Sequence, residues 1–177
     1  MLLYQDPVAP NARRVRMFLA EKGVAYATAE VSIARATHQT PEFRQKSPLA
    51  VVPVLELDDG RVLRESMAIC RYIDDLHPTP NLLGADAWER AQIEMWNRHA
   101  EMELLFPIGQ VFRNTHAFWV GRIKQAPEFG EIMRELLAAR LDWFEGELAT
   151  RPYLAGERFT VADITAVCAL EDRKSVV

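Results

Sequence analysis

The chain has 177 residues, 49% of them hydrophobic and 26% charged, and a formal net charge of −4. This composition is typical of a globular protein with a buried core and excludes collagen-like and intrinsically disordered chains. The negative charge argues against sequence-independent binding of nucleic acid, which depends on clustered Lys and Arg. We therefore interpret the local run of Arg13, Arg14 and Arg16 as a solvated helix face.

The sequence also lacks the signals of several other classes. No apolar stretch reaches the roughly 20 residues that span a bilayer, and the first residues lack the basic start and apolar run of a secretory signal. We expect a cytoplasmic protein with no membrane partner. Cys70 and Cys168 lie singly in apolar helical patterns, and the four histidines have no ligand spacing, which predicts neither a disulfide nor a metal site.

Strand and helix patterns alternate over residues 1–78. We expect a strand at 2–4, a helix from 10 to about 23, a strand at 26–33, a short helix beginning at 40–42, a hairpin of 51–57 with 61–63, and a helix from Ser66 to about 76. The turn residues Asp58, Asp59 and Gly60 indicate the hairpin. This βαβαββα order predicts an α/β domain in which helices pack on a mixed sheet.

The pattern changes after a linker at residues 79–86, which contains Pro80. We expect a long helix at 88–113 that Pro107 and Gly109 bend or end, an amphipathic helix at 128–148, and a last helix from 161 onward. Thr160 and Asp163 have the spacing of a capping box, which indicates where the last helix starts. The sequence thus predicts an all-helical domain over residues 87–171.

Val52-Pro53 is the most unusual local feature, because proline cannot donate a hydrogen bond to a β-ladder. One hypothesis is a cis peptide bond, which turns the N–H and C=O groups of Val52 outward to pair with an extended ligand peptide. The alternative is an ordinary proline of an edge strand, since only about 5–6% of X–Pro bonds in folded proteins are cis. The dipeptide alone leaves both interpretations open.

Two predicted helix starts can attract an anion through their free amides and the helix dipole. Glu65 and Ser66 open one of them, where Ser66 is either a simple N-cap or a partner for a carboxylate. The turn that contains Ala9 and Asn11 opens the other, and a helix N-terminus there would lower the pKa of a nearby thiol.

Taken together, four segments resemble the cytosolic glutathione S-transferase superfamily, most closely its bacterial theta-like members. They are PNARRV at 10–15, SPLAVVPVL at 47–55, ESMAI at 65–69 and FTVADI at 159–164. The resemblance implies a thioredoxin-like first domain and an all-helical second domain. It also implies a homodimer that uses glutathione as co-substrate and a small hydrophobic electrophile, with no metal.

The resemblance assigns the glutathione contacts residue by residue. Pro53 matches the family's cis proline, and the backbone of Val52 would pair with the cysteinyl unit. Glu65 and Ser66 match the pair that holds the γ-glutamyl end. His38 falls where theta-like members place a histidine near the glycyl carboxylate, although a solvated loop histidine is the alternative. Many relatives carry Lys or Gln at the position of Val51, which cannot make their polar contact.

Ala9 is the larger departure, because theta-like enzymes carry a Ser there whose hydroxyl stabilises the glutathione thiolate. Alanine has no donor. The candidate catalytic residues that could replace it are Asn11, which we favour, and Tyr4. The alternatives are that Asn11 is a helix N-cap and that Tyr4 is a buried strand residue.

An apolar wall for the electrophile is expected between residues 106 and 119. The candidates are Phe106, Phe112, His116 and Trp119. Aromatic residues on helices are more often part of the core, and that interpretation stays open.

The C-terminal segment 172–177 follows an apolar helical pattern with no cap or breaker. It matches the translation of a common short-read sequencing adapter, so we expect a truncated helical domain followed by a non-native tail.

The sequence therefore predicts a glutathione transferase that joins the glutathione thiolate to a small electrophile. One alternative is a glutathione-binding carrier or interaction module without catalysis, which the absence of a hydroxyl at Ala9 and of a polar side chain at Val51 motivates. Another is a glutathione-dependent reductase of disulfides or peroxides.

Overall fold

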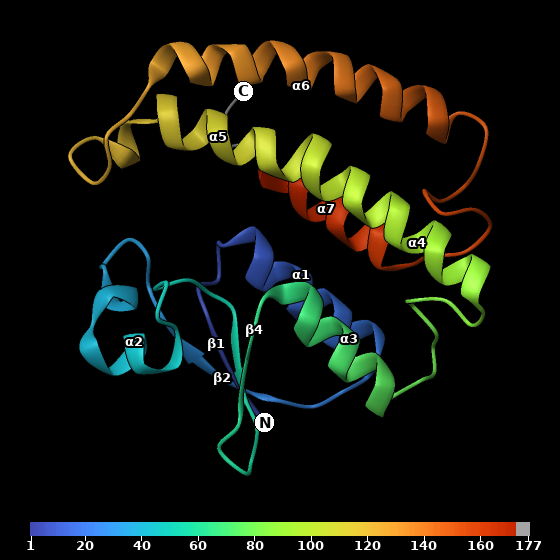
Figure 1. The fold of residues 1–177 in the computed structure, drawn as a ribbon, viewed down its shortest axis with the longest axis horizontal. Helices are drawn as coiled ribbons and strands as arrows, with labels where there is room; N and C mark the ends of the chain where they lie inside the picture. The colour runs from blue at the N-terminus through green and yellow to red at the C-terminus, as the bar shows by residue number, and fades with distance from the viewer. Residues whose placement is uncertain (173–177) are drawn as a thin grey trace. The chain divides into compact units, whose positions relative to one another are not determined.

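The computed structural model describes residues 1–172. The chain forms two compact units, and the boundary along the sequence falls between Asn81 and Leu82 (Figure 1). This boundary falls within residues 79–86, the segment interpreted as a linker. Of the segment interpreted as a non-native tail, residues 173–177 lie outside the described part of the chain.

Unit 1 is built on a mixed sheet of four strands. They are β1 (Leu2–Gln5), β2 (Ala27–Glu30), β3 (Val54–Glu56) and β4 (Val62–Arg64). The strand order is β2-β1-β3-β4, with β1 parallel to β2 and antiparallel to β3, and β3 antiparallel to β4. The predicted α/β order is confirmed, although strands β2 and β3 are shorter than expected.

Helices pack on both faces of this sheet. Successive side chains of β1 point to opposite faces, which determines which helices each of them contacts. The helical elements are α1 (Pro10–Glu21), the 3₁₀ turn η1 (Thr37–Gln39), α2 (Pro41–Lys46) and α3 (Ser66–Leu76). Tyr4 and its strand neighbour Val54 lie on the face that packs against Phe43 of α2. Leu3 and its partner Leu55 point to the opposite face, which α1 and α3 cover (Figure 1).

The arginines of α1 do not form the predicted solvated face. Arg14 is fully buried, because it lies one helical turn before the core residue Phe18 and so shares its side of the helix. Arg16 donates a hydrogen bond to the carbonyl oxygen of Pro7 over 2.9 Å. The interpretation is wrong for these two residues, which hold neighbouring segments in place.

Unit 2 is helical over the described residues, as predicted. Its elements are α4 (Ala87–His99), the π-helical turn η2 (Ala100–Leu105), α5 (Phe106–Thr115), the 3₁₀ turn η3 (Ala117–Trp119), α6 (Pro127–Leu148) and α7 (Val161–Asp172). The π turn ends two residues before Pro107, which has no N–H to continue the regular pattern. The chain stays helical through this turn and continues as α5 to Thr115. Among residues 1–172, no helix has the length and apolar character that a bilayer crossing requires.

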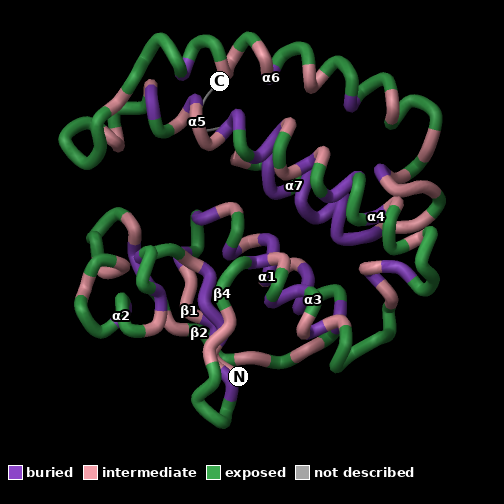
Figure 2. Tube along the Cα trace, in the orientation of Figure 1, coloured by how far each residue is buried: buried purple, intermediate pink, exposed green. Residues whose placement is uncertain are grey.

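The amphipathic stripe of α6 is only partly buried. Leu137 and Phe144 join the core of unit 2 beside Trp96. Ile132 is 58% exposed and Leu148 is 41% exposed, so the ends of the stripe face solvent. Figure 2 shows the same pattern, in which most of α6 is exposed and only a few of its positions are buried.

Asp163 provides the predicted start of α7. Its Oδ2 accepts hydrogen bonds from the Thr160 amide over 2.8 Å and from the Thr160 hydroxyl over 3.1 Å. The hydroxyl therefore donates to the acid, where a standard capping box has it accept an amide of the first turn. Oδ1 of Asp163 also accepts the amide of Leu154 over 2.9 Å, so one buried carboxylate joins the helix start to the preceding loop.

Candidate functional site

The turn before α1 is organised by the buried side chain of Asp6. Its Oδ1 accepts the amide of Val8 over 3.0 Å, and its Oδ2 accepts the amide of Ile33 over 2.7 Å. The turn therefore has a fixed shape where it delivers Ala9 to the helix N-cap position. Sequence reasoning missed this role of Asp6. An Asp two residues before a turn amide is the local signal for it.

Asn11 lies in the first turn of α1, where its side chain is exposed. Ala9 is the N-cap residue and Pro10 takes the first helical position, so the N-cap interpretation of Asn11 is wrong. Within residues 1–172 its side-chain amide has no hydrogen-bond partner. The amide is therefore available to a ligand beside the positive end of the helix dipole.

Tyr4 is engaged within the protein. Its hydroxyl donates a hydrogen bond to Glu56 Oε2 over 2.7 Å, and the same oxygen accepts Lys46 Nζ at 2.8 Å. The hydrogen bond to Glu56 and burial raise the pKa of Tyr4 above its ordinary value. Its ring also packs beside Phe43, with the ring centroids 6.2 Å apart. Tyr4 is thus a half-buried strand residue whose only hydroxyl proton is already donated.

The segment before β3 presents unpaired backbone groups. Ser47 Oγ accepts the amide of Val51 over 3.0 Å and donates to the carbonyl oxygen of Val51 over 2.9 Å. The Val52-Pro53 bond is cis, as hypothesised, and β3 begins at Val54, so Pro53 precedes the strand and does not lie inside it. Within residues 1–172, the N–H and C=O groups of Val52 have no hydrogen-bond partner. These groups can pair with the backbone of an extended peptide.

Glu65 and Ser66 lie at the N-terminus of α3, as predicted. Glu65 is exposed and is the N-cap, and its φ of 68° puts it in the left-handed region that non-glycine residues rarely adopt. Ser66 is the first helical residue, so its interpretation as an N-cap is wrong. Its Oγ accepts a hydrogen bond from Arg14 Nη1 over 2.7 Å. The free amides of the first turn and a side-chain hydroxyl meet at this point, which suits a carboxylate.

His38 lies in the 3₁₀ turn η1 and is half-buried. Its Nδ1 is buried, and no residue of the described chain pairs with it. This ring nitrogen therefore has an unused capacity for a hydrogen bond. Among residues 1–172, no group of three or more His, Cys, Asp or Glu side chains is placed to hold a metal ion.

Three of the four residues expected to form an apolar wall lie together in unit 2. The ring centroid of Phe112 lies 4.8 Å from that of His116 and 6.0 Å from that of Trp119. Phe118, which sequence reasoning missed, joins them, and its amide donates to His116 Nδ1 over 3.1 Å. Phe106 is 49% exposed, and its place on α5 differs by six residues from that of Phe112, which puts it on another face of the helix.

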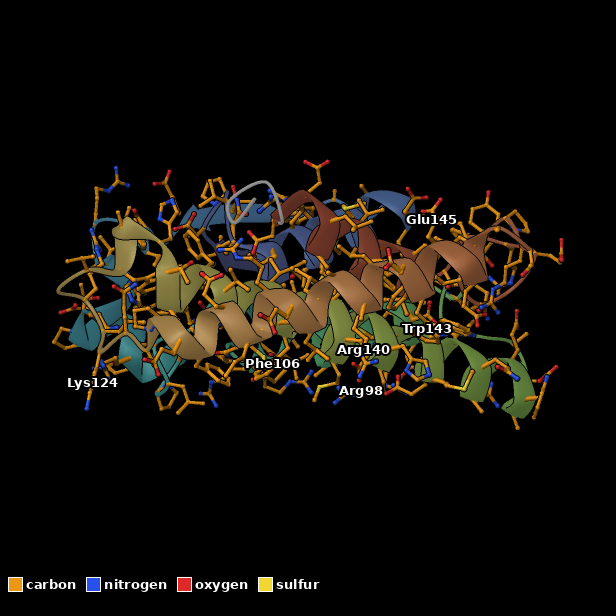
Figure 3. All side chains as sticks on the ribbon, turned by 90° about the horizontal axis from the view of Figure 1, so that it is seen from above. Arg98, Phe106, Lys124, Arg140, Trp143 and Glu145 are labelled. Atoms are coloured by element: carbon orange, nitrogen blue, oxygen red, sulfur yellow. The ribbon has the colours of Figure 1, made fainter. Side chains whose placement is uncertain are left out.

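Figure 3 shows the position of Phe106 along unit 2, some way from Lys124 in the loop after η3. Phe106 is the first residue of α5, whereas Phe112, His116, Phe118 and Trp119 lie near its last turn and in the following turn η3. The aromatic cluster is thus at the C-terminal end of α5, and Phe106 is at the N-terminal end.

Two sequence models of protein families match the chain. The model described as "Glutathione S-transferase, N-terminal domain" matches residues 8–76, and that described as "Glutathione S-transferase, C-terminal domain" matches residues 116–173.

Individual proteins of known name are similar over almost the whole chain. Glutathione S-transferase 2 of Saccharomyces cerevisiae is 37% identical over 174 residues, which cover 96% of this chain and 75% of the yeast protein. The crystal structure of a glutathione S-transferase domain-containing protein of Marinobacter aquaeolei is similar with a TM-score of 0.93 and 38% identity. The matched part covers 98% of this chain and 87% of the Marinobacter chain. The crystal structure of Gtt2 from Saccharomyces cerevisiae also gives a TM-score of 0.93, with 36% identity. The matched part covers 98% of this chain and 86% of the Gtt2 chain.

Proposed function

Because the chain belongs to the glutathione S-transferase family, we propose that it binds glutathione on unit 1 and transfers the thiolate of this tripeptide to a small electrophile. The observation that carries the proposal is the backbone of Val52, whose N–H and C=O have no partner within residues 1–172. A tripeptide can pair with both groups as a short added strand.

The other contacts follow from the side chains of the same unit. In this proposal, the Ser66 hydroxyl and the first amides of α3 bind the γ-glutamyl carboxylate, and the carboxylate of Glu65 binds the γ-glutamyl ammonium group. Pro53 fixes the backbone beside the cysteinyl unit. His38 contributes its imidazole ring to the glycyl end in this proposal. Val51 makes no polar contact, and we expect weaker binding than in relatives with Lys or Gln there.

Thiolate formation needs a donor, because Ala9 has none. Asn11 is exposed in the first turn of α1 with its side-chain amide unpaired within residues 1–172, whereas the hydroxyl proton of Tyr4 is donated to Glu56. We therefore assign Asn11 as the residue that donates to the sulfur. The thiol loses its proton to solvent, and the thiolate then forms a carbon–sulfur bond with the electrophile while the leaving group departs with its electron pair.

The electrophile in this proposal is hydrophobic and contacts the aromatic residues of unit 2. Phe112, His116 and Trp119 form the cluster that supports this assignment, and Phe106 is a separate apolar contact. We further propose a homodimer in the cytoplasm, in line with the family.

The test combines calorimetry with a pH profile on the protein that carries its natural C-terminal sequence. We expect binding heat at millimolar glutathione and conjugation of an aryl chloride activated by nitro groups. Asn11→Ala should raise the pKa of the bound thiol by about one to two units, since a charge-assisted hydrogen bond contributes about 1.5–3 kcal/mol. Tyr4→Phe should leave that pKa unchanged.

Each other outcome has a distinct meaning. An absence of heat at millimolar glutathione would overturn the proposed function. Binding without turnover of any electrophile would indicate a carrier or interaction module. Turnover of a glutathione mixed disulfide, without conjugation, would indicate a reductase. An unchanged thiol pKa in Asn11→Ala would remove only the assignment of Asn11.

A further inference from the structure

The hydrogen bond between Arg14 and Ser66 joins α1 to the start of α3. Arg14 Nη1 lies 2.7 Å from Ser66 Oγ, Arg14 is fully buried, and Ser66 is 5% exposed. A bond between two buried polar side chains is short and well shielded from water, so it holds both groups in one orientation.

The chemistry of the two groups decides which one donates. A guanidinium group has five N–H donors and no acceptor, whereas a serine hydroxyl has one donor and two acceptor lone pairs. Ser66 Oγ must therefore accept from Arg14, and its own proton remains free to donate. The amides of the first turn of α3 are donors as well, so they cannot take up that proton.

We propose that Arg14 is a positioning residue that fixes the Ser66 hydroxyl as a donor toward the γ-glutamyl carboxylate. This inference rests on the proposed binding of glutathione. Without Arg14, the hydroxyl proton can rotate toward other acceptors and the oxygen can turn its lone pairs toward the ligand. With Arg14, the positive charge polarises the O–H group and strengthens its hydrogen bond to an anion.

A purely structural role for Arg14 makes a different prediction. If the bond only braced α1 against α3, its loss would lower stability and weaken every ligand of unit 1 to the same degree. If Arg14 acts through the Ser66 hydroxyl, its loss weakens only ligands that carry the γ-glutamyl carboxylate, and only while Ser66 is present. A double-mutant cycle separates the two cases.

The experiment measures the Kd of glutathione by calorimetry for the wild type, Arg14→Met, Ser66→Ala and the double variant. We expect Arg14→Met to raise the Kd about tenfold, which is the loss of one charge-assisted hydrogen bond. In the Ser66→Ala background, we expect Arg14→Met to change the Kd by less than about twofold. For γ-aminobutyryl-cysteinylglycine, which lacks the carboxylate in question, wild type and Arg14→Met should bind equally.

The control is Arg61→Met, which removes the same charge from the exposed β3–β4 hairpin, where the side chain of Arg61 pairs only with Asp59 among the residues described. We expect it to leave the Kd unchanged. If Arg14→Met fails to fold, Arg14→Lys replaces it, with a smaller rise in Kd that again disappears in the Ser66→Ala background.

The results distinguish failure of this inference from failure of the proposed function. A wild type that binds no glutathione overturns both. A wild type that binds glutathione while Arg14→Met binds it equally well overturns the role of Arg14 alone. Equal losses in both Ser66 backgrounds, or equal losses for glutathione and the carboxylate-free analogue, overturn it as well, because Arg14 would then act independently of the hydroxyl.

Discussion

Tyr4 and Glu56 are joined by a hydrogen bond of 2.7 Å from the phenol to Oε2, across neighbouring strands of the sheet. The same carboxylate forms an ion pair with Lys46 of α2 at 2.8 Å. The bond from Lys46, followed by that from Tyr4, lowers the pKa of Glu56, and the bond to Glu56 raises the pKa of Tyr4. The folded chain therefore favours a neutral phenol beside an ionised carboxylate.

The pH dependence of stability follows from these two directions. The lowered pKa of Glu56 stabilises the fold above its ordinary value of 4.5, and this contribution is lost as the pH falls through the folded pKa. The raised pKa of Tyr4 stabilises the fold below its ordinary value of 10.0, and this contribution is lost as the pH rises through the folded pKa. The Glu56→Gln variant should therefore lose less unfolding free energy on acidification than the wild type. In this variant the pKa of Tyr4 should lie closer to the ordinary value for tyrosine.

Urea unfolding over a pH series and absorbance titration of the phenols provide the measurements. Tyr4→Phe identifies which step of the titration belongs to Tyr4. Identical acid dependence of wild type and Glu56→Gln would show that the carboxylate is not held in its ionised form by Lys46 and Tyr4.

Ser47 is predicted to control the segment that presents Val52. Ser47→Ala removes both hydrogen bonds to Val51, and we expect a loss of about 1–3 kcal/mol of unfolding free energy because each bond contributes about 0.5–1.5 kcal/mol. The Kd of glutathione should rise as well, because the segment can then leave its binding conformation. Ser32→Ala is the control, since among the residues described Ser32 Oγ accepts only the amide of Arg35 and has no bond to this segment. Equal Kd values for the two variants would contradict the prediction.

Lys22 and Asp74 form an ion pair in which the lysine side chain is completely buried. Lys22 Nζ also donates to the carbonyl oxygen of His77 over 2.8 Å and to that of Pro80. Lys22→Met should lower the unfolding free energy by about 3–5 kcal/mol, because it leaves Asp74 without its cation. Adding Asp74→Leu should recover part of this loss, since no unpaired charge then remains.

Thermal and urea unfolding of the two single variants and the double variant test this coupling, with Lys124→Met as the exposed-lysine control. A double variant whose loss equals the sum of the single losses would show that the two side chains do not stabilise each other.

The parts of the fold that could be predicted from sequence are those that local chemistry decides. Asp58, Asp59 and Gly60 are residues that adopt turn conformations at low cost, and they form the turn of the hairpin between β3 and β4. Thr160 and Asp163 meet at a separation of three residues, so their contact needs no information from the rest of the chain. Such local sequence signals predict a turn or a helix start correctly whatever the rest of the chain packs against that turn or helix.

The features that sequence reasoning missed depend on contacts far apart in the chain. The burial of Arg14 depends on Ser66, 52 residues away, and three arginines in four positions look like a solvated face when that partner is unknown. Asn11 was left open to interpretation as an N-cap, although the proline before it is a local signal that the helix already begins at Pro10. Candidate site residues were found where a backbone irregularity was visible, as at Pro53. They were missed where a side chain holds such a backbone segment by hydrogen bonds, as Ser47 does for Val51.

The two glycines of α6 should respond to the same substitution with opposite signs. A Cβ at Gly146 meets nothing within 4 Å, whereas a Cβ at Gly130 would lie 2.5 Å from Thr115 Cγ2 and 3.2 Å from Asn114 Cβ. Gly146→Ala should raise the unfolding free energy by about 0.5–1 kcal/mol, because alanine loses less backbone entropy than glycine in a helix. Gly130→Ala should lower it by about 1–3 kcal/mol, because Thr115 cannot move aside while its hydroxyl donates to the carbonyl oxygen of Val111 over 2.8 Å. Urea unfolding followed by circular dichroism measures both, and stabilisation by both substitutions would show that α6 does not pack against the end of α5 as closely as these distances require.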